Sequence, residues 1–261
     1  MNYNNIPPIT IGSGNSQIRI YGIQGGMGVK ISGKRLSSAC MKNGLLGVIA
    51  SVGLGVANDR FGKELIENER RIADASSEER KLIFEELYVK ANVAAFIEEI
   101  QAARVLSQDE SGNLQGFLGV NVMCALREKD ILFRTSLEQG VDVILSGAGI
   151  PRNLPELKLK YSVKDTKLIP IVASGGYAGL ISKLWEKKYG YYADAVVVEG
   201  PMAGGHLGYN KEELSNANFV KHGLGDIVKS VRETLKPFEQ NAGRRIPVIV
   251  AGGIFYGGDI R

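Results

Sequence analysis

Short apolar runs rich in Val and Ile recur along the chain, and most are continuous instead of alternating between apolar and polar residues. Each run leads into a glycine-rich turn and then into an amphipathic stretch. Continuous runs of this length are typical of strands buried on both faces, as in a parallel sheet covered by helices. The predicted strands are Arg19–Ile23, Leu45–Ala50, Phe117–Val122, Asp142–Leu145, Leu168–Ala173, Asp194–Val198 and Pro247–Ala251.

Helical stretches lie between these strands, and several of them end at a glycine or at Asn-Gly, a common helix C-terminal signal. Strands that alternate with helices indicate an α/β fold. The predicted helices in this alternating pattern are Leu36–Lys42, Glu128–Gln139, Gly176–Lys188 and Ile227–Phe238.

The segment Arg60–Ser107 breaks the alternation, because it is rich in Glu, Arg, Lys, Ala and Leu and contains no strand pattern. It predicts two helices, Phe61–Ala73 and Glu78–Ser107, and the Ser76-Ser77-Glu78-Glu79 run can cap the second. We interpret the segment, about residues 60–107, as a helical excursion beside the sheet. Residues 1–261 are therefore expected to form a single domain.

Seven strand-helix units favour a (β/α)8 TIM barrel, which typically takes about 250 residues. The chain stops at Gly257–Arg261, where a seventh helix should begin, so we expect a barrel that is truncated after the seventh strand and lacks its eighth unit. An open doubly wound sheet is the alternative, although it usually shows a glycine fingerprint after its first strand.

Charge and composition narrow the class of protein. The 32 Lys and Arg residues exceed the 28 Asp and Glu residues by only four, and they are spread along the chain, which does not favour nucleic-acid binding. No apolar run approaches the ~20 residues of a membrane span, and the polar start, Met1–Ser16, has no signal-peptide core. Cys40 and Cys124 are expected to be reduced core thiols. These features predict a cytoplasmic protein with no membrane partner.

The candidate chemistry clusters where strands end, which is where barrel enzymes place their active sites. Gln24-Gly25-Gly26-Met27-Gly28 follows the first predicted strand, and its glycines allow either a tight turn or close approach to a flat ligand. Asn121 lies in a buried run, where it either bonds to neighbouring backbone or faces a ligand. Small residues at Ser146–Gly149 and Ser174–Gly176 would leave an open floor for a cofactor.

The loop after the sixth predicted strand, Glu199–Gly208, contains one of only two histidines. His206 there can exchange protons near neutral pH, or it is an exposed loop residue. His222 is interpreted as a surface or capping residue, and Glu199 as a structural carboxylate beside the loop. The glycines of Ala251–Ile254 can cradle a phosphate. No set of His, Cys, Asp and Glu has the spacing of metal ligands.

Five of these motifs occur in an order that resembles the nitronate monooxygenase family, formerly called 2-nitropropane dioxygenase, and the related FMN-dependent enoyl-acyl-carrier-protein reductases. They are Gln-Gly-Gly-Met, Gly-Val-Asn, Gly-Ala-Gly, Glu-Gly-x-x-Ala-Gly-Gly-His and Ala-Gly-Gly-Ile. The resemblance implies an FMN-containing barrel in which His206 matches the catalytic histidine. The cofactor-binding residues that it implies are Gln24, Gly25, Gly26, Met27, Asn121, Ser174, Gly175, Glu199, Gly204, Gly205, Gly252 and Gly253.

The resemblance implies oxidation of alkyl nitronates with O₂ to carbonyl compounds and nitrite. The alternative is reduction of an enoyl thioester with NAD(P)H as the reductant. A non-catalytic barrel that binds a phosphate ligand, or a barrel synthase or isomerase for a phosphorylated substrate, also stays open. The helical excursion is long enough to form a homodimer surface. Because the family continues into an eighth strand, we expect this chain alone to have unpaired strand edges, to retain FMN weakly, to aggregate and to be inactive.

Overall fold

The computed structural model describes residues 7–71, 75–163, 165–206 and 208–254. The chain divides into two compact units. The first unit comprises Met1–Pro8 and Ile20–Ile144, and the second comprises Ile9–Arg19 and Leu145–Arg261. The division falls inside strand β5, Val143–Gly147. The position of the expected seventh helix, residues 257–261, lies outside the described residues.

In the first unit, strands β3 and β4 pair in parallel, with Leu46 beside Phe117 and Ala50 beside Asn121. All of β3 is buried, as its continuous apolar sequence predicted. Helices α1 and α4 pack against this pair of strands. The elements of this unit are α1 Lys34–Lys42, β3 Leu46–Ala50, α2 Leu54–Ala57, α3 Asp59–Arg71, α4 Ser77–Ser107, β4 Phe117–Met123 and α5 Lys129–Glu138.

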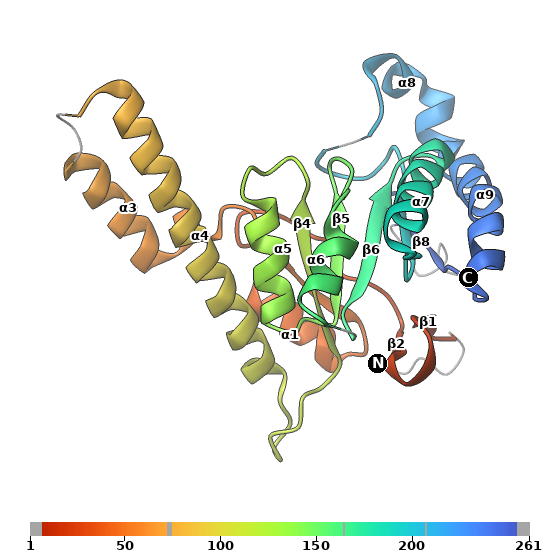
Figure 1. Ribbon diagram of the computed structural model, residues 1–261, viewed down its shortest axis with the longest axis horizontal. Coiled ribbons are helices and arrows are strands. Elements are labelled where there is room, and N and C mark those ends of the chain that lie inside the picture. Colours follow the sequence, from red (N-terminus) through yellow and green to blue (C-terminus); the bar gives the residue numbers. More distant parts are fainter. Residues whose placement is uncertain (1–6, 72–74, 164, 207, 255–261) are drawn as a thin grey trace. The chain divides into compact units, whose positions relative to one another are not determined.

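In the second unit, β7 pairs in parallel with β6 on one side and with β8 on the other. Helices α7 and α9 lie side by side next to these strands (Figure 1). The elements of this unit are β1 Ile9–Ile11, the 3-10 helix Gly14–Ser16, α6 Leu154–Lys160, β6 Lys167–Val172, α7 Gly175–Tyr189, β7 Val196–Glu199, α8 Lys211–Ser215, α9 Ala217–Ala242 and β8 Val248–Ala251; β2, Ile18–Ile20, begins in it and pairs with β1.

Strands β3 to β8 are hydrogen-bonded neighbours in chain order, and helices connect them. This consecutive order with helical connections is the topology of a TIM barrel, so the predicted α/β barrel class is confirmed. The first predicted strand, Arg19–Ile23, was wrong as a single element. Its start belongs to β2, whereas Ile23 forms an isolated parallel bridge with Leu46. Gly22 separates the two parts, and glycine weakens a strand interior.

The helical excursion divides into two parts with different surroundings. Ser76 caps α4 through the predicted capping box with Glu79. The buried residues of α4 begin only at Ala91, and from there the helix packs against α1, α2 and β3. The start of α4 lies beside α3 (Figure 1). The excursion therefore contacts the sheet and its neighbouring helices through the later part of α4, whereas the first turns of α4 pack against α3.

Helix α9 differs most from its predicted extent, and the short helices α2, α6 and α8 were not predicted. Helix α9 begins ten residues before its predicted start at Ile227, because Asn216 Oδ1 accepts hydrogen bonds from the N–H groups of Asn218 and Phe219. Glycines in its first turns conceal the helical pattern. Helix α6 was not predicted, although Pro155 stands in its first turn, where proline is well tolerated.

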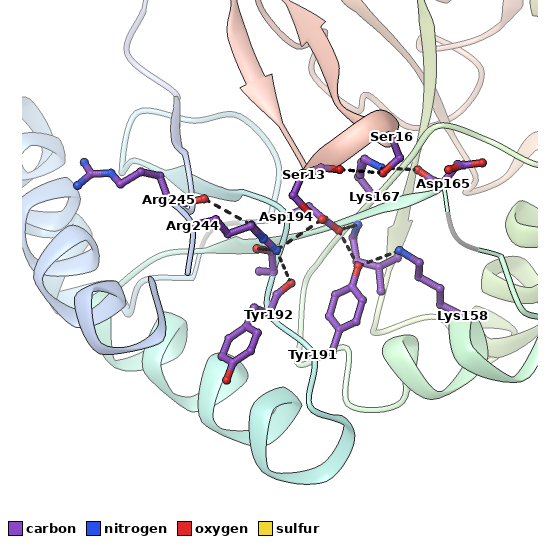
Figure 2. Close-up of polar contacts among 12 residues, drawn as sticks. Ser13, Ser16, Lys158, Asp165, Lys167, Tyr191, Tyr192, Asp194, Arg244 and Arg245 are labelled. Carbon is purple, nitrogen blue, oxygen red and sulfur yellow. Dashed lines mark hydrogen bonds and ion pairs between the residues drawn. The ribbon is translucent and has the colours of Figure 1, made fainter. Parts of the chain in front are cut away.

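A buried polar network joins β6 to the segment before β7 (Figure 2). Asp194 Oδ2 accepts hydrogen bonds from the Leu168 N–H at 2.9 Å and from the Tyr191 hydroxyl at 2.6 Å. Its Oδ1 lies 3.6 Å from Arg244 Nη2, and Lys158 Nζ donates to the Tyr191 hydroxyl oxygen at 3.0 Å. Burial raises the pKa of Tyr191 well above its ordinary value and lowers the pKa of Lys158.

A second buried lysine ties the turn between β1 and β2 to β6 (Figure 2). Lys167 is only 2% exposed, and its Nζ donates to Ser16 Oγ at 2.9 Å and to the Asp165 carbonyl at 2.8 Å. The side chain passes directly over Gly12, whose φ of +89° a residue with a Cβ rarely adopts. The turn is therefore shaped around the lysine.

Candidate functional site

The residues predicted to bind a cofactor belong to both units, so each group is described within its own unit. The Gln24 turn (residues 24–27) and Asn121 belong to the first unit. The His206 loop (residues 200–209, with 207 outside the described residues) belongs to the second unit, as do Ser174, Gly175, Gly252 and Gly253.

The side chain of Gln24 is used to hold its own turn onto β3. Its Oε1 accepts from the Val48 N–H at 3.1 Å, and its Nε2 donates to the Val48 carbonyl at 3.1 Å and to Ser32 Oγ at 2.8 Å. The residue is 9% exposed. The amide group thus pairs with both backbone groups of one strand residue. What this turn can offer a ligand is therefore the backbone of its glycines and the exposed Met27 side chain.

Ser32 is a residue of this site that the sequence did not reveal. Its hydroxyl donates to the Gly25 carbonyl at 2.8 Å and accepts from the Met27 N–H at 2.9 Å, so it closes the turn around one side chain. Its own N–H donates to the Met27 carbonyl at 3.0 Å. A lone serine eight residues after Gln24 carries no sequence signal for such a role. Only the folded backbone brings it inside the turn.

The turn and Asn121 are in direct contact. A Cβ atom at Gly26 would lie 2.6 Å from both Cβ and Cγ of Asn121, a distance that real side chains do not adopt. Asn121 sits on β4 beside Ala50, and its carbonyl accepts from the Ser51 N–H at 3.0 Å. The structure therefore brings these two predicted residues together at the ends of neighbouring parallel strands.

Gly25 differs from Gly26, because nothing lies within 4 Å of its would-be Cβ and its φ is not in the left-handed region. Neither packing nor backbone conformation requires glycine there. Gly204 in the His206 loop has the same two properties. Gly225 on α9 has the same two properties, so the contact of Gly25 and Gly204 with a cofactor stays a prediction.

In the second unit, the loops after β7 and β8 touch each other. Glu199 is paired with Ala251, and the Gly200 N–H donates to the Ala251 carbonyl at 2.8 Å. A Cβ atom at Gly252 would lie 2.7 Å from the Cβ of Ala203. Gly252 and Gly253 both have positive φ, at 84° and 79°. The predicted phosphate loop and the His206 loop are thus in direct contact, through Gly252 and Ala203.

Glu199 ends β7 and is half-buried. Burial raises the pKa of its carboxyl group, and the charge of His206 opposes this rise. His206 itself is exposed. The pair therefore places an accessible imidazole within electrostatic reach of a desolvated carboxyl group. The side chain of His222, on α9, lies outside the described residues.

Replacement of Glu199 by glutamine is expected to change how stability depends on pH. Because the folded pKa lies above the ordinary value of 4.5, the folded protein binds this proton more tightly than the unfolded chain does. The wild type therefore loses stability as pH rises from 4.5 to the folded pKa, and glutamine does not. In thermal melts between about pH 4 and pH 8, the melting temperature of the variant should rise relative to that of the wild type as the pH increases across that window. Replacement of the exposed Glu138 by glutamine is the control. If the difference in melting temperature between Glu199→Gln and the wild type did not change with pH, the raised pKa of Glu199 would be contradicted.

Tyr209 is a second residue that the sequence did not reveal. Its hydroxyl donates to the Glu199 carbonyl at 2.6 Å, and its ring meets the edge of the Phe219 ring at 5.3 Å. Burial, together with the charges of Glu199 and Glu213, raises the pKa of Tyr209 to about 12. The hydroxyl therefore stays protonated and holds the end of the His206 loop against β7. The sequence signal that could have identified Tyr209 is its position as an aromatic residue directly before the Asn210 capping box.

Ser174 and Gly175 have structural roles at the start of α7. The Ser174 hydroxyl caps the helix by accepting from the Tyr177 N–H at 3.3 Å. A Cβ at Gly175 would lie 2.4 Å from Ser230 Oγ on α9, so glycine allows the two helices to approach. Their predicted contact with a cofactor stays a prediction.

No group of three or more His, Cys, Asp and Glu residues in the described part of the chain is placed to hold a metal ion. Nor is any helix within these residues both long and apolar enough to cross a membrane.

Solved structures with a similar fold are enzymes. FabK from Thermotoga maritima is 23% identical, with a TM-score of 0.57, and the match covers 92% of this chain and 53% of that one. The M276A mutant of that protein is 22% identical, with a TM-score of 0.57, and the match covers 92% of this chain and 56% of that one. Nitroalkane oxidase from Streptomyces ansochromogenes is 19% identical, with a TM-score of 0.56, and the coverages are 92% and 60%. The chain thus spans a little over half the length of these proteins.

The sequence was also compared with curated proteins and with family models. No curated protein matches it. The model described as nitronate monooxygenase matches residues 13–261, which include the Gln24 turn, Asn121, the His206 loop and Gly252. This match covers nearly the whole chain, and the predicted resemblance is confirmed. The chain belongs to the nitronate monooxygenase family.

Proposed function

We propose that this chain is part of an FMN-dependent oxidoreductase that oxidises alkyl nitronates with O₂ to carbonyl compounds and nitrite. One observation carries the proposal. In a chain of this family, the loop with the accessible His206 is packed against Gly252 of the loop after β8. The loop that carries a proton-exchanging side chain and the glycine-rich phosphate loop are therefore in direct contact.

Each unit, taken by itself, offers groups that suit one part of a flat, phosphate-bearing cofactor. Gly25 and Gly204 leave open space that no packing requirement explains, and Gly252 and Gly253 hold a backbone that side chains would strain. In the proposal, the glycines of the Gln24 turn and the Asn121 side chain border the ring system. Gly252 and Gly253 hold the phosphate. Gln24 and Ser32 contribute indirectly, since their side chains fix the shape of the turn.

Bound FMN would supply the electron-accepting chemistry, and the protein supplies binding, orientation and electrostatics. His206 is assigned the proton exchange with the substrate, or its orientation, because an imidazole titrates near neutral pH. Glu199 places a carboxyl group within electrostatic reach of that imidazole. Tyr209 keeps the loop ordered by its hydrogen bond to the Glu199 carbonyl.

The test uses the chain extended at its C-terminus by the remaining βα unit of the family, mixed with FMN. Its absorption spectrum is recorded anaerobically before and after addition of propyl-2-nitronate or NADH. Uptake of FMN and bleaching by the nitronate, but hardly by NADH, would support the proposal. Rapid bleaching by NADH would favour the enoyl-thioester reductase instead. If the protein took up no FMN, both flavin-dependent functions would be ruled out, and a barrel that binds another phosphate ligand would remain.

A pair of neighbouring glycines separates cofactor binding from folding. Gly25→Ala is expected to keep the melting temperature, because its methyl group meets no protein atom, and to weaken FMN binding by roughly tenfold or more, about 1.4 kcal/mol. Gly26→Ala should lower stability by about 1–3 kcal/mol through overlap with Asn121. Fluorescence titration of FMN and thermal melts measure both. Unchanged FMN affinity in Gly25→Ala would remove the Gln24 turn from the proposed site.

A further inference from the structure

An open cavity of about 1240 Å³ lies in the first unit, away from every residue assigned to the proposed function. Helix α4 forms one wall, and the segment that leads into α5 forms the other. The two helices are neighbours in Figure 1. The stretch of α4 involved, Lys81–Ile97, rises about 24 Å at 1.5 Å per residue. The cavity is thus long enough for an extended molecule.

The walls of the cavity are mainly apolar. Phe84, Val89, Val93, Ile97 and Ile131 contribute aliphatic and aromatic surface. All of them keep some exposure in the described structure. Apolar surface in a concave site favours a ligand with an apolar body.

One buried charge lies in this apolar surrounding. Glu128 lines the cavity and is only 7% exposed, and among the described residues its Oε1 has no hydrogen-bond partner. Glu128 precedes α5, yet its side chain does not cap that helix. A buried carboxylate oxygen without a donor is costly, so it favours a ligand that supplies one.

The other charges of the cavity are either paired or in contact with water. Arg127 Nη1 lies 2.6 Å from Glu85 Oε1, an exposed ion pair that links the two walls. Lys81 and Lys90 are exposed. Exposed charges of both signs contribute little to selectivity. The desolvated Glu128 is therefore the group that sets which head group is preferred.

We propose that this cavity binds an aliphatic or aromatic molecule with a cationic, hydrogen-bond-donating head group, the head lying at Glu128 and the apolar body along α4. An amine-bearing amphiphile has both properties. A fatty acid has the apolar body but the wrong charge, because its carboxylate would face another carboxylate. The cavity therefore discriminates by the sign of the head group.

The test uses the neutral dye N-phenyl-1-naphthylamine, whose fluorescence rises in apolar sites, and its displacement by dodecylammonium or dodecanoate below their micelle concentrations. We expect dodecylammonium to displace the dye at a concentration roughly 10- to 100-fold lower than dodecanoate, the range for a hydrogen bond to a buried charge. Glu128→Gln keeps the shape and removes the charge, so the two displacement concentrations should become nearly equal.

Val93→Glu, in the cavity wall, should abolish the dye signal. Val105→Glu is its matched control, since Val105 lies on the same helix, is 65% exposed and does not line the cavity. Circular dichroism shows whether Val93→Glu folds, and if it does not, the Glu128→Gln comparison decides alone. Absence of dye binding, or equal displacement by both amphiphiles in the wild type, would overturn the proposal. So would self-association that Val93→Glu abolishes without any dye uptake, which would make this face an interface between copies.

Discussion

Replacement of His206 by alanine is expected to lower kcat/KM for an alkyl nitronate by roughly 10²–10⁴-fold, the usual contribution of one positioned acid-base group. The imidazole is exposed and within electrostatic reach of Glu199, and the glycines around it leave room for substrate. The loop is held by Tyr209, whose hydrogen bond does not involve the histidine, so the fold should survive the change. Steady-state kinetics measure the effect, with the FMN-loaded protein extended at its C-terminus by the remaining βα unit of the family.

The pH profile makes this prediction specific. His206→Ala should lose the limb of the kcat/KM pH profile that comes from proton exchange with the substrate, while it keeps its affinity for FMN. His222→Ala, which removes the other histidine of the chain, is the matched control and should keep the wild-type profile. If the His222 variant lost the limb and the His206 variant kept it, the assigned roles of the two residues would be exchanged.

Replacement of Asp194 by alanine is expected to lower the free energy of unfolding by about 3–5 kcal/mol, the cost of removing one partner from a buried charge network. Three interactions end on this carboxylate, from the Leu168 N–H, the Tyr191 hydroxyl and Arg244. Lys158 would lose its link to the charge as well, because it donates to the Tyr191 hydroxyl. Urea unfolding followed by circular dichroism measures the loss.

The comparison for this prediction is an exposed ion pair. Glu138→Ala removes the partner of Arg134 on the surface of α5, and such helix pairs contribute only about 0.3–0.5 kcal/mol. Asp194→Asn should fall between the two, since an amide oxygen can still accept a hydrogen bond. A loss for Asp194→Ala no larger than that for Glu138→Ala would show that the network in Figure 2 does not stabilise the fold.

The strands of the barrel could be predicted because burial on both faces leaves a continuous apolar run, as in β3 and β7. The first predicted strand failed for a physical reason. The residues of this stretch pair with two different segments, because β2, Ile18–Ile20, pairs with β1, whereas Ile23 pairs with Leu46. A local sequence pattern does not reveal which segment each residue pairs with. The sequence did not predict the early start of α9, because Gly223 and Gly225 disfavour a helix there. In the structure, the N-cap Asn216 starts the helix in spite of them.

Candidate site residues were found where a strand end coincided with unusual composition, as at the Gln24 turn and the His206 loop. Their detailed roles could not be predicted. Gln24 and Ser174 look like ligand contacts in the sequence, yet both side chains satisfy backbone groups of their own unit. Ser32 and Tyr209 act through hydrogen bonds to residues five to ten positions away, and such bonds leave no periodic or compositional signal.

The close approach of Gly26 to Asn121 has a consequence for how these sequences can diverge. With 2.6 Å between the would-be Cβ of Gly26 and the Asn121 side chain, the two positions share space that holds only one side chain. A substitution at either position is constrained by the other, so they should vary as a pair through evolution. In related sequences of this fold, a side chain at position 26 should be accompanied by glycine at position 121.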